Sequence, residues 1–154
     1  MLQIDFVKEL LKECHKRGIN TAVDTAGNVP FEYFEQILPY TDTFLFDVKC
    51  ASEDLHKELT GVSNRLILDN LKRLRDLNKQ VVACIPLIGG ANDSDQEIKA
   101  IYELLKGRGA DKVKILPYHS LAMHKYEALG KEFYAYTTPS NEKIQKYRKM
   151  FKEI

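Results

Sequence analysis

The sequence FLFDVK, residues 44–49, joins a short apolar run to two charged side chains, Asp47 and Lys49. Side chains alternate across a β-strand, so Asp47 and Lys49 are expected to point to the same face. A carboxylate and an ammonium at the end of a buried strand are costly to hold unless they pair with each other or bind a ligand. The hexamer therefore predicts either a ligand-binding pair or a solvated ion pair at the end of a strand.

Polar side chains also follow two other predicted strands. Asp24 and Thr25 end one strand, and His119 follows the last. The carboxyl ends of parallel strands meet at one edge of a sheet, where ligands bind. Acid, hydroxyl, amine and imidazole groups together suit a zwitterionic ligand better than an apolar one. Each also has a simpler explanation, because Asp24 and Thr25 could start a turn into Gly27 and His119 could be an exposed loop residue.

The spacing of apolar residues predicts that helices and strands alternate along the chain. The stretch from about 120 to 138 is expected to be irregular. Alternation of this kind is typical of a parallel sheet with right-handed crossovers and outer helices, so we expect a single α/β domain over residues 1–154. The expected strands cover 21–23, 44–46, 81–87 and 113–116, and the expected helices begin near Asp5, Pro30, Ser63, Ser94 and Ser140, with a short helical turn after Ser52.

Three local patterns make finer predictions. The run Phe44–Phe46 is expected to be buried on both faces, as in a parallel sheet under helices. Phe6 and Leu10 belong to the apolar stripe of the first helix, which is expected to face the core. Ser94 and Glu97 have the spacing of a capping box, in which each side chain bonds the backbone amide of the other residue.

Length, charge and cysteine use exclude several classes of function. A chain of 154 residues with 44% hydrophobic and 29% charged residues is ordinary for a globular domain. A formal net charge of +1 gives no electrostatic reason to bind nucleic acid or an anionic membrane. No apolar run is long enough to span a bilayer. The three cysteines, Cys14, Cys50 and Cys84, form no C-x-x-C pair, which predicts a cytoplasmic location and buried thiols rather than disulfides.

Several short motifs together resemble one family. They read VDTAG at 23–27, FDVK at 46–49, HKELTGVSN at 56–64, PLI at 86–88, ND at 92–93, LPYH at 116–119, KY at 125–126 and LG at 129–130. In this order they resemble the glycyl-radical-enzyme activating enzymes, above all the pyruvate formate-lyase activating type. Those proteins are radical S-adenosylmethionine (SAM) enzymes, so the resemblance implies a partial (β/α) barrel of parallel strands with outer helices.

The resemblance also assigns roles to the polar strand ends. In that family the residues matching Asp24, Thr25 and Asp47 are associated with a monovalent cation beside the SAM carboxylate, and those matching Lys49 and His119 belong to the SAM site. Carboxylate and hydroxyl oxygens suit an alkali or alkaline-earth ion. The implied cofactors are SAM and, in the full-length enzyme only, a [4Fe–4S] cluster. No catalytic residue is assigned.

One part of the family pattern is missing from this sequence. The cluster motif C-x-x-x-C-x-x-C has no counterpart, because Cys14, Cys50 and Cys84 have neither its spacing nor its position. We therefore expect this chain to match the C-terminal portion of such an enzyme, without the first two strand–helix units, and to be inactive alone. The full-length protein is expected to take an electron from a donor such as flavodoxin and to form a glycyl radical on a partner like pyruvate formate-lyase.

The residues leave two other functions open. Lys49 beside Asp47 at a barrel mouth could form a Schiff base in an aldolase-like lyase. A non-catalytic half-barrel could instead bind SAM or a protein partner. Without two preceding strands, the strand at 21–24 would be an open sheet edge, which predicts a homo-oligomer formed through that edge.

Overall fold

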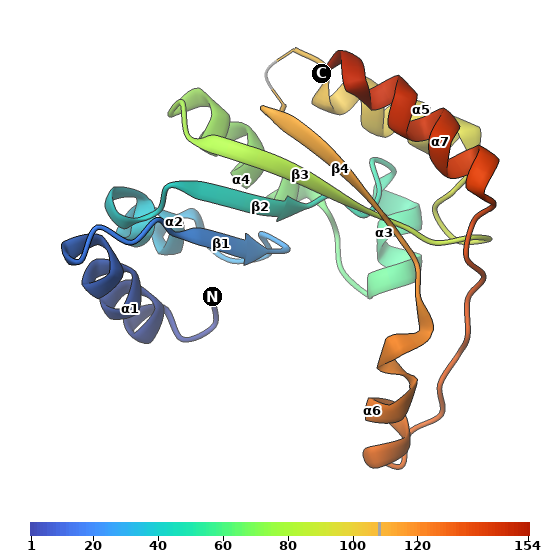
Figure 1. Cartoon of the computed structure of the whole chain (residues 1–154), viewed down its shortest axis with the longest axis horizontal. Coiled ribbons are helices and arrows are strands. Elements are labelled where there is room, and N and C mark those ends of the chain that lie inside the picture. The colour runs from blue at the N-terminus through green and yellow to red at the C-terminus, as the bar shows by residue number, and fades with distance from the viewer. Residues whose placement is uncertain (108) are drawn as a thin grey trace.

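The protein, described over residues 1–107 and 109–154 of a computed structural model, forms one sheet of four parallel strands in the order β1-β2-β3-β4 (Figure 1). Each strand pairs with the next strand along the chain. This arrangement confirms the predicted α/β class and all of the predicted strands. The strands are β1 (Ala22–Thr25), β2 (Thr43–Asp47), β3 (Gln80–Leu87) and β4 (Lys112–Pro117).

Helices connect these strands and cover one side of the sheet. In the part of the chain that the structure describes, none of them is long and apolar enough to cross a membrane. Short 3-10 turns lie at Leu38–Tyr40, Ser120–Ala122 and Phe151–Glu153. The α-helices are α1 (Ile4–Lys16), α2 (Phe31–Ile37), α3 (Glu53–Thr60), α4 (Arg65–Asp76), α5 (Asp95–Leu105), α6 (Met123–Ala128) and α7 (Asn141–Met150).

Serine side chains cap the starts of three of the described α-helices. The side chains of Ser52, Ser94 and Ser140 accept backbone N–H bonds at the starts of α3, α5 and α7, as their positions in the sequence predict. The start of α4 differs, because its N-cap is Asn64 rather than Ser63. The hydroxyl of Ser63 still accepts the amide of Arg65, the first residue of α4, at 3.1 Å, and it donates to Glu53 of α3.

One face of the sheet forms the hydrophobic core. Phe44 and Phe46 of β2 and Ala83 and Ile85 of β3 have no exposed surface. The register places Phe46 beside Ala83, so large and small side chains alternate across the strands. Helices from along the chain pack on this face through apolar residues, which are Leu11, Phe31, Phe34, Ile37, Ile67, Leu71, Leu74, Ile98, Ile101, Leu105, Ile144, Tyr147 and Phe151.

The opposite face, called here the open face, has no such helix layer in the described residues. It carries Leu45 and Asp47 of β2, Cys84 of β3 and Lys114 of β4. Leu45 is only partly buried and Lys114 is exposed. The prediction that residues 44–46 are buried on both faces is therefore wrong. Helices pack on one side only, so alternate residues of β2 lie in different surroundings.

The apolar stripe of α1 is only partly buried. Leu11 is in the core, but the side chains of Phe6 and Leu10 are 66% and 52% exposed. The prediction that both face the core is wrong. The helix packs against α2 and the turn at Leu38–Tyr40. Within the described chain the sheet ends at β1, so it offers no surface for Phe6 and Leu10 to cover.

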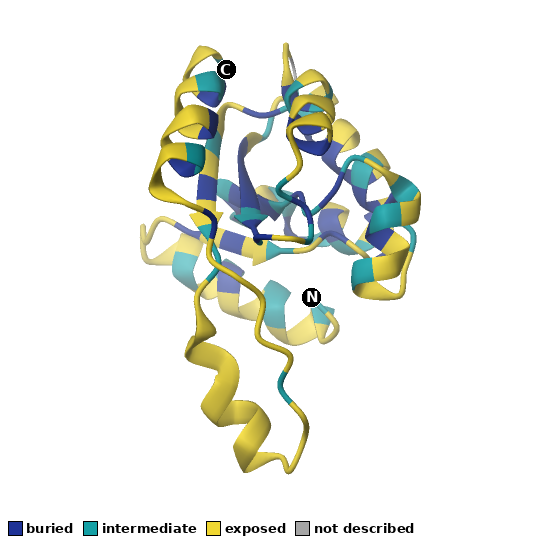
Figure 2. Ribbon diagram, turned by 90° about the vertical axis from the view of Figure 1, so that its right-hand side faces the viewer, coloured by how far each residue is buried: buried dark blue, intermediate teal, exposed yellow. Residues whose placement is uncertain are grey.

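A projecting arm, residues 119–138, leads from β4 toward α7 and stands away from the body (Figure 1). Figure 2 shows that its surface is almost entirely exposed. The prediction of an irregular stretch is wrong for the part that forms α6. The ring of Tyr126 in α6 packs against Phe133 with centroids 5.2 Å apart. Because α6 rests on local contacts rather than on a core-facing stripe, apolar periodicity gives no signal for it.

Candidate functional site

Asp47 and Lys49 lie at the carboxyl end of β2, on the open face. The Lys49 ammonium donates to Asp47 Oδ2 at 2.6 Å, and the two side chains keep 32% and 27% of their exposure respectively. Val48 points the other way and is 1% exposed, and its amide donates to the Cys84 carbonyl at 2.8 Å. The predicted alternation is confirmed. The pair is accessible to a ligand because neither side chain is fully buried.

Asp24 lies on the same face, one strand away. The register places it beside Leu45, two residues before Asp47. Burial raises the pKa of the Cys84 thiol, and the nearby carboxylates of Asp47 and Asp24 raise it further. Lys114 acts in the opposite direction. Both aspartates therefore lie close enough to one sulfur to influence it, so the structure brings Asp24 and Asp47 together.

Thr25 turns away from this cluster. It pairs with Phe46, whose side chain faces the helices, and its hydroxyl accepts the Gly27 amide at 3.0 Å. This is the simpler turn-forming role considered for the Asp24-Thr25 dipeptide. Binding of a monovalent cation by Thr25 stays a prediction.

His119 lies just past β4 at the base of the projecting arm, and it is exposed. Its neighbour Tyr118 is anchored to β3, because its amide donates to the Leu87 carbonyl at 2.9 Å. The Tyr118 hydroxyl is buried and has no hydrogen-bond partner among the described residues. An unpaired buried hydroxyl costs free energy. The SAM role of His119 stays a prediction.

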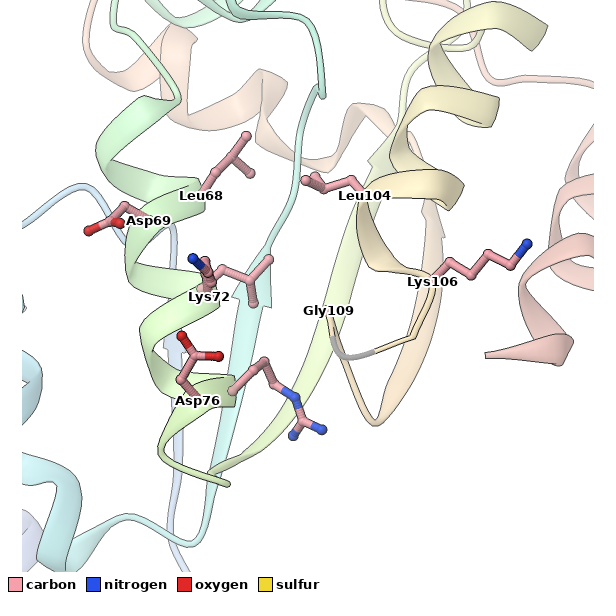
Figure 3. Close-up of a pocket in the computed structure, with 9 residues that line it drawn as sticks. Leu68, Asp69, Lys72, Asp76, Leu104, Lys106 and Gly109 are labelled. Carbon is pink, nitrogen blue, oxygen red and sulfur yellow. The ribbon is translucent and has the colours of Figure 1, made fainter.

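A small cleft of about 250 Å³ opens beside Lys49 at the ends of β2 and β3. Pro86 and Asn92 line it, and Tyr136 reaches it from the projecting arm. A larger groove, of about 600 Å³, lies between α4 and the end of α5, where leucines from the two helices face each other (Figure 3). None of the predicted site residues lines that groove. The cleft beside Lys49 is the hollow that adjoins the predicted site.

Sequence reasoning missed the role of three buried polar side chains around residues 49–52. Asn64, Asn92 and Glu97 are 2%, 1% and 6% exposed. Each bonds backbone groups within the segment 49–52. Glu97 stands four residues before Ile101, so helical spacing alone could have placed it on the buried side of α5.

The capping box predicted at the start of α5 is only half formed. Ser94 accepts the Glu97 amide at 3.1 Å, as expected. The Glu97 carboxylate accepts instead from the amides of Ala51 and Ser52. Because α5 lies against the start of α3, the carboxylate bonds these two amides rather than the amide of Ser94.

The three cysteines are separated in the fold. Cys14 lies on α1, Cys50 follows β2 and Cys84 is within β3. Burial, reinforced by the charge of Glu97, raises the pKa of Cys50 to about 12. Across residues 1–107 and 109–154, no group of three His, Cys, Asp or Glu side chains could hold a metal ion. The cysteines of this chain therefore do not fit a [4Fe–4S] cluster, which needs closely set thiolates.

Sequence comparison adds a family to this geometry. A family model described as the Radical SAM superfamily matches residues 1–105. This chain belongs to the radical SAM superfamily. The family resemblance carried by the short motifs is thus confirmed. Asp24 and Asp47 lie at the carboxyl ends of neighbouring strands in a radical SAM sheet.

Two relatives of this radical SAM chain are activating enzymes. The chain is 37% identical over 152 residues to the trans-4-hydroxy-L-proline dehydratase activating enzyme of Clostridioides difficile. The aligned region covers 96% of this chain and 50% of that protein. It is also 34% identical over 155 residues to the pyruvate formate-lyase-activating enzyme of Clostridium pasteurianum. This second aligned region covers 97% of this chain and 65% of that protein. The chain therefore spans only about half to two-thirds of the length of these relatives.

A solved structure shares the fold. A domain of pyruvate-formate lyase-activating enzyme from Bacteroides vulgatus superimposes with a TM-score of 0.82 at 27% sequence identity. The match covers 99% of this chain and 87% of that domain. This likeness confirms the predicted radical SAM type of α/β fold.

Proposed function

We propose that the whole protein is a radical SAM activating enzyme, which forms a glycyl radical on a partner enzyme, and that this chain supplies part of its SAM site. One observation carries the proposal. Asp24, Asp47 and Lys49 converge on the uncovered face of the sheet, in a chain whose relatives are activating enzymes. SAM and its cluster would supply the one-electron chemistry, while the residues of this chain would bind SAM and orient it.

Charge complementarity supports a role in holding the amino-acid end of SAM. Lys49 would pair with the SAM carboxylate, which can compete with Asp47 for the same ammonium. Asp24 and Asp47 would accept from the SAM ammonium or share a monovalent cation. For Thr25 to be its third proposed ligand, the Thr25 hydroxyl would have to leave the Gly27 amide and turn to the open face. His119 would lie on the polar nucleoside side.

Binding of SAM to this chain is the direct test. Isothermal titration calorimetry with SAM should give binding to the native chain and a loss of roughly tenfold or more in affinity for Lys49→Gln, because a charged hydrogen bond contributes about 1.5–3 kcal/mol. Lys146→Gln, which breaks the ion pair to Asp95 on the far helices, is the matched control and should bind SAM normally. Native affinity in Lys49→Gln would remove Lys49 from the site.

Activity of this chain alone is not part of the proposal, because its three cysteines lie on separate elements and do not suit the cluster. Anaerobic reconstitution with iron and sulfide should leave no SAM-reactive cluster signal in electron paramagnetic resonance. A cluster signal that changes on adding SAM would overturn this part. A glycyl radical enzyme of the pyruvate formate-lyase or a related type, and an electron donor such as flavodoxin, are proposed as partners of the whole protein only.

The aldolase-like alternative is weaker. A Schiff-base lysine must present a free, neutral amine to a keto substrate, whereas the Lys49 ammonium donates to Asp47. Borohydride treatment in the presence of pyruvate should leave the mass of the chain unchanged. A stable adduct on Lys49 would favour the lyase instead.

The edge of β1 supports a second proposal, on assembly. In the described sheet, β1 pairs only with β2, so its other edge carries unpaired backbone groups. We propose that two copies of this chain associate through that edge. Light scattering at increasing concentration should show a dimer or larger species, and a monomer at all concentrations would refute it.

A further inference from the structure

The segment that follows β2, residues 49–52 (the post-β2 segment), is fixed by buried side chains from distant parts of the chain. Asn92 donates both of its amide hydrogens, to the carbonyls of Lys49 and Pro86, each at 2.7 Å. Its oxygen accepts the Ile88 amide at 2.8 Å. Asn92 is 1% exposed, and both of its amide hydrogens and its carbonyl oxygen are used. This one side chain therefore joins the end of β2 to the end of β3.

Two more buried side chains hold the rest of the post-β2 segment. Asn64 donates to the carbonyls of Cys50 and Ala51, each at 3.0 Å. Glu97 accepts from the amides of Ala51 and Ser52 just before α3 begins. A carboxylate at a helix N-terminus is favoured by the helix dipole. Backbone groups of all four residues in the segment are thus bonded by Asn64, Asn92 or Glu97.

We propose that Asn92, assisted by Asn64 and Glu97, is a positioning residue for the Lys49 ammonium; this inference rests on the proposed SAM-binding function. Lys49 connects the buried hydrogen bonds to the open face. Its carbonyl is held by Asn92, while its side chain reaches Asp47 on the surface. The ammonium is fixed before any ligand arrives, so SAM binding does not have to order this segment.

Two variants and one control test the inference. Asn92→Ala removes the side chain, and Asn92→Asp keeps its volume and acceptor oxygen but loses both donated bonds. Asp42→Ala is the control. Asp42 also links two strands, because it accepts from the Thr21 amide at 2.6 Å, but it does so at the amino ends of β1 and β2, away from Lys49. All three variants should lose some stability in urea titrations, so stability alone does not decide the matter.

The deciding measurement is the NMR signal of the Lys49 ammonium, assigned by its absence from Lys49→Gln. A bond to a carboxylate slows the exchange of ammonium hydrogens with water. We expect both Asn92 variants to speed this exchange up to about fivefold, the scale of losing a partly solvated ion pair, and Asp42→Ala to leave it unchanged. Unchanged exchange in the Asn92 variants, or equal acceleration in Asp42→Ala, would overturn the inference.

SAM titration of the same variants separates this inference from the proposed function. Affinity should fall roughly tenfold in both Asn92 variants and stay within about twofold in Asp42→Ala. If the native chain binds no SAM, the proposed function fails for this chain, while the ammonium signal still decides whether Asn92 positions Lys49. If the native chain binds and the Asn92 variants bind equally well, the positioning role is refuted and the proposed function stands.

Discussion

The two faces of the sheet come from the same strands but have different surroundings. On the helix-covered face, Phe44 and Phe46 have no exposed surface. On the open face, Leu45 and Asp47 alternate with them along the same strand and stay partly exposed. The alternation of a single strand therefore separates folding from binding, because the residues that stabilise the sheet are not those that meet a ligand.

The comparison also shows how a polar site can be rigid without apolar packing of its own. The covered face is held by apolar contacts. The open face is held at its carboxyl end by hydrogen bonds between side chains and backbone, in which Asn92 donates to carbonyls and Glu97 accepts from amides. Such bonds satisfy buried backbone groups and leave the side chains of Asp47 and Lys49 at the surface, where a ligand can reach them.

The largest expected effect is on the covered face. Phe46→Ala should reduce the free energy of unfolding by about 3–5 kcal/mol, because it empties a fully buried aromatic site. Leu45→Ala, one residue away on the open face, should cost only about 1 kcal/mol, since the side chain is partly exposed already. Urea denaturation of both variants measures the difference. Equal losses would mean that the open face is covered by apolar contacts in solution.

Gly27 gives the next largest effect, because it lies against the covered face. Its φ is +73°, and an added Cβ would clash with the ring of Phe46. Gly27→Ala should cost about 2–4 kcal/mol, from backbone strain and overpacking together. Gly18→Ala is matched, since φ there is +67° but no atom lies within 4 Å of the added Cβ. Gly18→Ala should cost about 1–2 kcal/mol. The difference between the urea denaturation midpoints of the two variants then isolates the contact with Phe46.

A smaller effect on stability is expected from the ion pair on the open face. Lys49→Gln should change the free energy of unfolding by less than about 1 kcal/mol, because both partners are partly solvated. Its effect on SAM affinity should be much larger. A loss of stability similar to that of Phe46→Ala, measured in the same urea titrations, would show that Lys49 serves the fold and would break the separation of the two faces.

The reactivity of the three thiols should show which of them are buried, without any substitution that alters stability. Burial raises the pKa of Cys50 to about 12 and also raises the pKa of Cys84, so both thiols stay protonated at pH 8. Cys14 is only partly buried and should be the first to react with an aromatic disulfide reagent. For a pKa near 12, the thiolate fraction at pH 8 is about one in ten thousand, and it rises about tenfold with each pH unit. Rapid labelling of Cys84 at pH 8 would show that the open face exposes it.

Local patterns in the sequence determined much of this protein. Apolar periodicity gave the parallel α/β class, Ser52, Ser94 and Ser140 gave three helix starts, and alternation placed Asp47 and Lys49 on one face. These features depend on residues within a few positions of each other. Backbone geometry and capping chemistry act over that range, so the sequence alone predicts them.

Tertiary structure decided the rest, because those features depend on which distant surfaces meet. The exposure of Leu45 and Phe6 depends on where the helix layer ends, which no local pattern encodes. Glu97 has the spacing of a capping box, yet its carboxylate bonds Ala51, 46 residues away. Asn92 reaches Lys49 across 43 residues. A hydrogen bond between such distant groups forms only when packing brings them together, so only the folded chain reveals how the Lys49 site is held.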